Sequence, residues 1–329
     1  MEQPKRSPTI SKPSQSQSNK NKTRTLTPSR KTIVGLGELL FDIIDDQPIL
    51  GGAPVNFAIQ AHQVLFQHGY QGVPAVRLGN DCLARQAITQ LQSFGLNTDF
   101  VQYDARHPTG TAIVHRESVG HRFEIVENVC WDHFQWDDQL DLLSRSAAVV
   151  CFGTLGQRSE FGRSTIQQFV ESAEQAIRIF DVNLRQHYYN ADIIKHGCHH
   201  ANLLKLNDDE LIPVCQSLGI SPADTPTHSC QQILAETPLE YIVFTQGALG
   251  TTMITTDIVQ TGAPVEFPPA PNADSVGAGD ACTAGIIAGL LLELPLEAIV
   301  NLANRLGAYV ASKPGATPTL PANLLTLQS

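Results

Sequence analysis

Four short apolar runs, separated by stretches with helical character, constrain most strongly how this 329-residue chain can fold. The runs lie at residues 147–152, 177–182, 203–206 and 241–245, and the helical stretches lie near 159–176, 207–217 and 228–236. A strand that is apolar on both sides has to be covered on both sides, as happens in parallel sheets. The sequence therefore predicts a mostly parallel sheet with helices on both faces.

The first half of the chain begins in the same way and then changes. Short strands are expected at 33–37 and 74–78, and helices over 55–68 and 81–94. Three further strands are expected without helices between them, at 98–103, 110–115 and 121–126. Strands that follow one another so closely usually pair as antiparallel ribbons. Two helices, 278–292 and 296–312, should end the fold, and the first is rich in small residues, which predicts tight packing against the sheet.

Charge is unevenly distributed along the chain. Residues 1–31 carry eight Lys or Arg and one Glu, which gives +7, so the net charge of −10 leaves −17 for residues 32–329. An acidic body of this kind is not expected to bind nucleic acid. The tail is rich in Ser, Pro, Lys, Gln and Thr, which predicts disorder, with a transit peptide as the alternative. The expected domains are thus a basic tail, 1–31, and a folded unit, 32–329.

The apolar and cysteine content point to a cytoplasmic protein. The chain has no run of 18 apolar residues and no apolar region near its start, so neither a membrane span nor a secretory signal is expected. Seven scattered cysteines favour free thiols in a reducing compartment. Cys198-His199-His200 fits no common zinc spacing, so these residues are interpreted as an ordinary helix end.

A glycine-rich turn at residues 274–280 is the sharpest chemical feature. Gly277 and Gly279 leave room for a charged group near the backbone, and the helix that follows presents unpaired N–H groups and the positive end of its dipole. Such a turn predicts an anion site. Asp280 in the first turn could simply complement the helix dipole, and this turn alone does not decide between that role and catalysis.

Five ordered blocks resolve the question by resemblance. They are residues 51–58, 180–185, 205–210, 244–250 and 274–280. Together they resemble the ribokinase-like (pfkB) carbohydrate kinases over residues 32–320, and residues 37–42 look most like bacterial fructokinases. The resemblance implies a three-layer α/β fold with a mostly parallel central sheet, helices on both faces and a small β lid formed mainly within 98–127. No Walker-type phosphate loop occurs in the sequence.

The resemblance also implies a role for each matching position. Asp280 would be the catalytic base, and Gly277, Ala278 and Gly279 would hold the charge that develops on the phosphoryl group. The residues implied to bind the sugar are Asp42, Gly52, Asn56 and Arg185. Those implied to bind ATP are Asn183, Asn207, Glu210, Thr245, Gly247, Gly250 and Asn304. Asn207 and Glu210 would also hold Mg²⁺, through water. Arg158 follows a strand and is a further candidate.

The expected activity is ATP-dependent phosphorylation of a sugar hydroxyl, with D-fructose as the sugar. A kinase for another sugar, a sugar acid or a nucleoside stays open, as does an inactive relative that acts as a scaffold. Ser275 stands where the family usually has Thr, which keeps the hydroxyl. A K⁺-like ion is implied near Ala311, Ser312 and Gly315, and a homodimer that pairs through the lid is a further expectation.

Overall fold

A nine-stranded sheet forms the centre of the protein. The computed structural model describes residues 30–116 and 121–325. In spatial order the strands are β13 (Val259–Thr261), β12 (Thr251–Ile254), β11 (Tyr241–Thr245), β10 (Leu203–Asn207), β9 (Ile177–Asp181), β8 (Ala147–Phe152), β1 (Lys31–Gly37), β4 (Tyr70–Gly79) and β5 (Gln102–Asp104). All neighbours from β11 to β5 are parallel, while β12 and β13 are antiparallel additions. The mostly parallel sheet is confirmed. The predicted tail, 1–31, lies outside the described residues except for Arg30 and Lys31.

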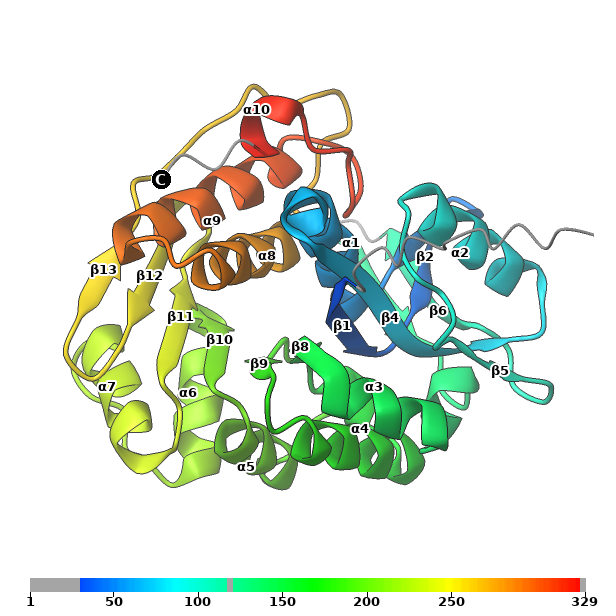
Figure 1. Cartoon of the computed structure of the whole chain (residues 1–329), viewed down its shortest axis with the longest axis horizontal. Coiled ribbons are helices and arrows are strands. Elements are labelled where there is room, and N and C mark those ends of the chain that lie inside the picture. Colours follow the sequence, from blue (N-terminus) through cyan, green and yellow to red (C-terminus); the bar gives the residue numbers. More distant parts are fainter. Residues whose placement is uncertain (1–29, 117–120, 326–329) are drawn as a thin grey trace, which may run out of the picture.

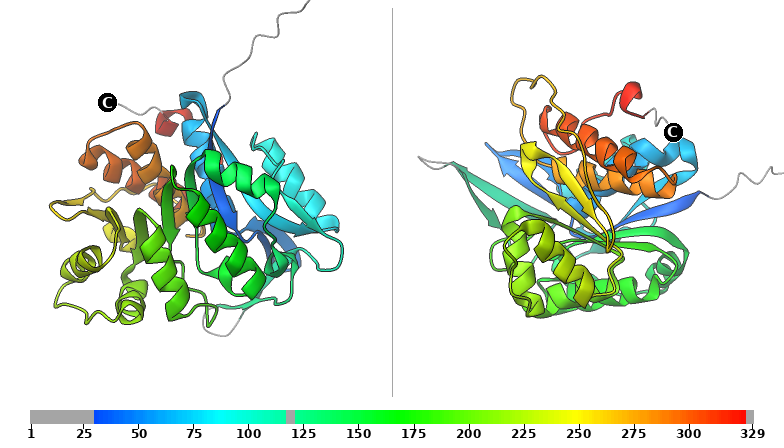
Figure 2. Two further views of the ribbon diagram at one scale, coloured as in Figure 1. Left: turned by 60° about the horizontal axis from the view of Figure 1, so that its bottom comes forward. Right: turned by 90° about the vertical axis from the view of Figure 1, so that its left-hand side faces the viewer.

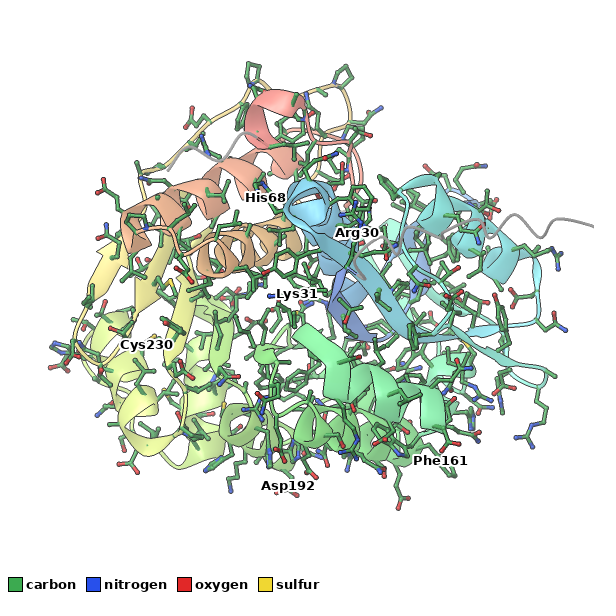
Figure 3. All side chains as sticks on the ribbon, in the orientation of Figure 1. Arg30, Lys31, His68, Phe161, Asp192 and Cys230 are labelled. Atoms are coloured by element: carbon green, nitrogen blue, oxygen red, sulfur yellow. The ribbon has the colours of Figure 1, made fainter. Side chains whose placement is uncertain are left out.

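Helices cover both faces of this sheet, so the predicted three-layer arrangement is confirmed (Figure 1). One face carries α1 (Ala53–Leu65), α2 (Cys82–Ser93), α8 (Ala278–Leu291) and α9 (Leu296–Ala311), with α10 (Ala322–Leu325) near the end of the chain. The other face carries α3 (Asp138–Ser146), α4 (Glu160–Ser172), α5 (Ala191–His200), α6 (Asp208–Leu218) and α7 (Pro226–Glu236). Figure 3 shows Phe161 and Asp192 on the outer side of this second layer.

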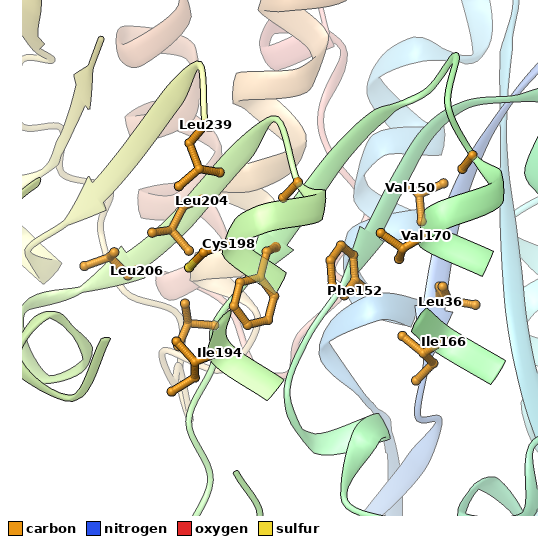
Figure 4. Packing of buried hydrophobic residues seen from close by; sticks show 14 of the residues in the cluster. Leu36, Val150, Phe152, Ile166, Val170, Ile194, Cys198, Leu204, Leu206 and Leu239 are labelled. Carbon is orange, nitrogen blue, oxygen red and sulfur yellow. The ribbon is translucent and has the colours of Figure 1, made fainter. Parts of the chain in front are cut away.

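Strand β8 shows why a two-sided cover is needed. Val149 and Cys151 belong to the cluster under α8 and α9, whereas Val150 and Phe152 belong to the cluster on the α4 and α5 side. Figure 4 shows Val150 and Phe152 close to Val170 of α4. Successive side chains of a strand point to opposite faces, so an uninterrupted apolar run supplies both clusters at once.

Helix caps explain where several helices begin. The Asp81 side chain accepts a hydrogen bond from the Ala84 N–H at 2.8 Å, and α2 starts at the next residue, as predicted. Helix α3 was not predicted, and of α5 only its end at residues 198–200 was expected, although Asp137 and Asn190 cap the two helices in the same way. Both residues are favoured N-caps.

Gly285 and Gly289 of α8 face α9, whereas the small residues of this helix were predicted to pack against the sheet. A Cβ atom on Gly285 would lie 2.7 Å from the Ala303 Cα, and one on Gly289 would lie 2.6 Å from the Ile299 side chain. Both contacts are to α9. Gly285 therefore lets the two helix backbones approach each other, and Gly289 leaves room for the Ile299 side chain. The alanines of α8, Ala281, Ala284 and Ala288, belong to the core cluster that includes residues of the sheet.

A second, four-stranded sheet lies on the β4 side of the molecule (Figure 2). Its order is β3 (Gln47–Gly51), β2 (Leu40–Ile44), β6 (Gly110–Arg116) and β7 (His121–Ile125). The predicted ribbon of β6 and β7 is antiparallel. The strand at 98–103 was predicted to belong to the lid, and this is wrong. The strand found there, β5, pairs with β4 in the large sheet. Instead β2 and β3 complete the small sheet, joined by a turn in which Asp45 and Asp46 have positive φ.

Within the described residues, no helix combines the length and apolar character that crossing a membrane would require.

Candidate active site

Polar side chains gather where the parallel strands end. Glu38 follows β1, Asn183 follows β9, and Asn207 and Thr245 are the last residues of β10 and β11. Parallel strands bring their carboxyl ends to the same edge of the sheet, where ligands of α/β proteins usually bind. The N-terminus of α8 supplies the next group of polar atoms.

The turn before α8 can be built only with glycine. Gly277 is the N-cap, with a φ of 78°, and a Cβ atom there would lie 2.4 Å from the Ala316 carbonyl oxygen. A Cβ atom on Gly279 would lie 2.9 Å from the Lys205 Nζ. The first N–H groups of α8 have no partner within the helix, and its dipole adds positive charge there. The turn and Lys205 together make an electropositive environment.

Asp280 lies in the first turn of α8 and is buried, with 7% of its surface exposed. Its Oδ2 accepts a hydrogen bond from the Asn56 Nδ2 at 2.9 Å. Burial, with a contribution from the nearby Asp181, raises the pKa of Asp280 to about 6, although Lys205 and the Asn56 hydrogen bond oppose the shift. Such a carboxylate is ionised at neutral pH and is basic enough to accept a proton.

A buried ion pair beneath the turn was not predicted. The Lys205 Nζ lies 2.9 Å from Asp181 Oδ1 and 3.1 Å from Asp181 Oδ2. Burial alone would lower the pKa of Lys205, but the carboxylates of Asp181, Asp280 and Glu210 outweigh it and hold the pKa above its usual value. Lys205 therefore stays charged. A lysine inside the apolar run 203–206 was the available signal for this site.

Glu38 is a second residue that the sequence did not single out. It is 4% exposed, and its Oε2 has no hydrogen-bond partner among the described residues. Burial raises the pKa of Glu38 to about 7; the Arg185 charge lowers it and the Asp280 charge raises it. Two buried carboxyl groups with raised pKa values thus influence each other at this edge, as is common in functional sites.

The four residues predicted to bind the sugar lie around these carboxylates. Asp42 is half-buried in β2, and burial raises its pKa to about 6 while Arg185 opposes the shift. A Cβ atom on Gly52, whose φ is 111°, would lie 2.7 Å from the Glu38 carbonyl oxygen. Asn56 is 4% exposed, and its Oδ1 has no partner among the described residues.

Arg185 lies near the carboxyl groups of this site. Its side chain is exposed, and its Nη1 donates to the neighbouring Leu184 carbonyl at 3.0 Å. Its charge nevertheless acts on Glu38, Asp42 and Asp280. Arg185 therefore acts on three carboxyl groups, whose oxygens can accept hydrogen bonds from a ligand rich in hydroxyl groups.

A cavity of about 470 Å³ opens on the other side of the glycine turn. Its lining includes six of the predicted residues: Thr245, Gly247, Gly250, Ala278, Gly279 and Asn304. The Asn304 Nδ2 donates to the Ala263 carbonyl at 2.9 Å, which holds the 262–264 segment against α9. Ser275, which stands where the family usually has Thr, also lines the cavity.

Asn207 and Glu210 form a capping box at the start of α6. The Asn207 Oδ1 accepts from the Glu210 N–H, and the Glu210 Oε2 accepts from the Asn207 N–H, both at 3.0 Å. The Glu210 Oε1 accepts from the Leu184 N–H at 2.9 Å, which ties α6 to the loop after β9. Asn183 has a φ of 45° in this loop. Asn183, Asn207 and Glu210 lie beside the ion pair and are not among the residues that line the 470 Å³ cavity.

Arg158 lies in a different cavity, of about 450 Å³, on the outer side of the molecule. Its guanidinium is paired with Asp132 at 2.8 Å and stacks on the Trp131 ring at 3.8 Å. Its Nη1 is buried and has no hydrogen-bond partner among the described residues.

Comparisons with known proteins agree with this geometry. Residues 44–323 match the model of the pfkB family carbohydrate kinases. The chain belongs to the pfkB carbohydrate kinase family. It is 26% identical to the fructokinase of Salmonella typhimurium over 306 residues, which covers 87% of this kinase and 95% of that protein.

Solved structures show the same fold. The structure of fructokinase with bound ATP from Xylella fastidiosa matches with a TM-score of 0.76 at 20% identity, covering 91% of this kinase and 98% of that chain. A putative ribokinase II from E. coli, in complex with ATP and Mg²⁺, matches with a TM-score of 0.72 at 19% identity, covering 88% and 94%. The ribokinase-like fold predicted from the sequence is confirmed.

Proposed function

We propose that this sugar kinase transfers the γ-phosphoryl group of ATP to a hydroxyl of D-fructose, with Asp280 as the base. One observation carries the proposal. The buried Asp280 carboxylate lies at the N-terminus of α8, and the glycine turn beside it also lines the 470 Å³ cavity. A base, an anion site and a nucleotide-sized cavity are thereby adjacent.

The residues suggest how the transfer proceeds. Asp42, Gly52, Asn56 and Arg185 hold the sugar so that one hydroxyl points to Asp280. Asp280 accepts the hydroxyl proton while the oxygen bonds to the γ-phosphorus and the bond to ADP breaks. N–H groups of Gly277, Ala278 and Gly279 stabilise the transferring group, because phosphoryl transfer depends on positioning and electrostatics. The products are a sugar phosphate and ADP.

ATP would occupy the 470 Å³ cavity, with Thr245, Gly247 and Gly250 along one side and Asn304 at the α9 side. The fructokinase of Xylella fastidiosa, which shares this fold, was crystallised with bound ATP. Asn183, Asn207 and Glu210 would approach the phosphates from the β9 and β10 ends.

Mg²⁺ fits the Asn207 and Glu210 pair through water. Both side chains offer oxygen, the ligand that Mg²⁺ prefers, but each already accepts backbone N–H groups of the capping box. Direct coordination would compete with these hydrogen bonds, whereas an ion that keeps its water ligands would not. When bound, the ion neutralises phosphate charge.

A monovalent cation completes the proposed site. The segments around Ser275 and 311–315 are joined because the Asp274 N–H donates to the Lys313 carbonyl, at 3.2 Å, and the Gly315 N–H donates to Asp274 Oδ2, at 3.0 Å. K⁺ would bind near Ala311, Ser312 and Gly315. Replacing K⁺ by Na⁺ in the assay would lower the rate if this ion contributes.

The deciding experiment is a panel of sugars, sugar acids and nucleosides, assayed for ADP release with MgATP and K⁺. Fructose should give the highest kcat/KM, and Asp280→Asn should remove the activity. A higher kcat/KM for another acceptor would replace fructose but keep the kinase. Absence of ADP release with every acceptor would favour the inactive scaffold.

The small sheet is proposed to act as the lid that excludes water, and its strands could pair between two subunits. Light scattering of the purified chain tests the homodimer. A cytoplasmic location is also part of the proposal, because all seven cysteines are free thiols, as suits a reducing compartment.

A further inference from the structure

A cluster of three metal-ligating side chains lies on the opposite surface of the sheet from α8, away from the kinase site. Glu171 is near the end of α4, and His196 and His200 are on α5. One ligand atom from each of the three lies within 4.8 Å of the others. Helices α4 and α5 are neighbours in this layer (Figure 1).

The two histidines share one face of α5 because they are four residues apart. Their rings are stacked, with centroids 4.2 Å apart. The His196 Nε2 lies 2.9 Å from the Glu171 Oε1, which brings α4 and α5 together at this point. The site is therefore built from two helices, and it is more than a pair of histidines on one helix.

One observation indicates that the polar atoms of this cluster are not all satisfied. The His196 Nδ1 is buried and has no hydrogen-bond partner among the described residues. A neutral imidazole has a free lone pair, which is what a metal ion requires.

Some charged groups near the cluster favour a bound cation and others disfavour it. The Glu171 carboxylate favours a cation, whereas Arg178 and His199 disfavour one. The Arg178 Nε donates to the Asn202 Oδ1 at 3.3 Å, so that part of its guanidinium is held by a neighbouring side chain.

We propose that Glu171, His196 and His200 form a binding site for Zn²⁺ that joins α4 to α5. Two imidazole nitrogens and one carboxylate oxygen suit Zn²⁺, and a water molecule would complete a tetrahedral site. Zinc bonds of about 2.0–2.2 Å place ligand atoms about 3.4 Å apart, so movements of up to about 1.4 Å would bring atoms that lie within 4.8 Å of one another to this spacing.

The motif that drew attention in the sequence is not the site. Cys198 is 0% exposed and packs in the core between α5 and the sheet, where Figure 4 shows it near Leu204. The His199 Nδ1 lies 2.8 Å from the Lys195 carbonyl. Of Cys198, His199 and His200, only His200 joins the cluster, and the spacing that matters is His196 to His200.

The test is calorimetric titration of the full chain with ZnCl₂, with excess MgCl₂ present to occupy oxygen-rich sites. Cys82 is an exposed thiol, so all variants carry Cys82→Ser. One equivalent should bind, and His196→Ala or His200→Ala should weaken binding about 10–100-fold. His199→Ala is the matched control on the same helix and should change the affinity less than about twofold. Circular dichroism confirms that each variant is folded.

Two further readouts separate this site from non-specific binding. At about 100 times the Kd, zinc should raise Tm by about 4 °C, and EDTA should reverse the rise. Co²⁺ should give a tetrahedral absorption band that Glu171→Gln weakens. Lack of one-to-one binding, or equal losses in His199→Ala and His200→Ala, would overturn the proposal. Neither result bears on ADP release, so the proposed kinase function is tested separately.

Discussion

Replacing Asp280 by Asn tests the proposed base through catalysis and stability at once. The side chain keeps its size, and an amide oxygen can still accept the hydrogen bond from the Asn56 Nδ2. The proton acceptor is lost, so kcat should fall about 10²–10⁴-fold, which is about 3–5 kcal/mol of activation free energy. ATP binding, measured by calorimetry, should change little.

The same substitution should lower the activity but raise the free energy of unfolding. The size of the gain in stability follows from the pKa of Asp280. Asp280 has a pKa of about 6 in the folded protein, whereas the usual pKa of an aspartate is 3.8. A raised pKa means that the folded state holds the proton more tightly, so stability falls as pH rises from about 4 to 6 and stays lower above 6. This difference in pKa of about 2 corresponds to about 3 kcal/mol. Asn carries no such charge, so Asp280→Asn should be more stable than wild type by up to about 3 kcal/mol at pH 8.

Urea unfolding of both proteins at pH 5 and pH 8 measures this difference. At pH 5 the gain should be about half of that at pH 8, because the wild-type carboxyl group is then mostly protonated in the folded state. In parallel, the wild-type kcat/KM should decrease below pH 6. A variant that turns over at a near-normal rate, or that is less stable than wild type at pH 8, would contradict the assignment of a buried, destabilising carboxylate as the base.

Three further changes test the rest of the site. Asp42→Asn should lower kcat/KM for the sugar about 10–100-fold with an unchanged KM for ATP, because it removes charge-assisted hydrogen bonds to hydroxyl groups. A change in the KM for ATP without a change for the sugar would contradict the sugar-binding role of Asp42. Glu210→Gln should raise the Mg²⁺ concentration needed for half-maximal rate and lower the free energy of unfolding in urea by about 1–2 kcal/mol, because the amide keeps only one of the two oxygens that accept from the Asn207 and Leu184 N–H groups; Asp208→Asn, in the same helical turn, is the control and should leave the Mg²⁺ requirement unaltered. Gly277→Ala should lower kcat more than tenfold and reduce Tm, because its Cβ would meet a backbone oxygen at 2.4 Å; Gly219→Ala has a similar φ of 75° but open space around it, and it should lose only about 1 kcal/mol of stability and no activity.

The sequence was most informative where local rules determine structure. Apolar runs identified β8 to β11, because a strand buried on both faces has few polar residues. Helix α8 was predicted to begin at Ala278, and it does. Motif order singled out the glycine turn, Asp280, Thr245, Gly247 and Gly250, and the family resemblance alone added Asn304. The structure places Thr245, Gly247, Gly250 and Asn304 around one cavity, and their roles stay predictions.

Features that depend on distant contacts were not predictable in this way. Strand β2 joins the small sheet because it pairs with β6, which comes much later in the chain. Lys205 and Asp181 were passed over because each looks like a polar interruption of an apolar run until the fold places them 2.9 Å apart. Glu38 and the Glu171, His196 and His200 cluster likewise depend on which elements become neighbours.

The close contact between α8 and α9 has a consequence for how a substrate could be enclosed. Gly285 lets the two helix backbones approach each other and Gly289 leaves room for the Ile299 side chain, so the contact resists sliding of one helix past the other. Asp280, the proposed base, lies on this closely packed pair of helices. If the small sheet acts as the proposed lid, its closure would carry Asp42 toward Asp280. An inhibitor that wedges β2 away from α8 would block the reaction without competing for the ATP cavity.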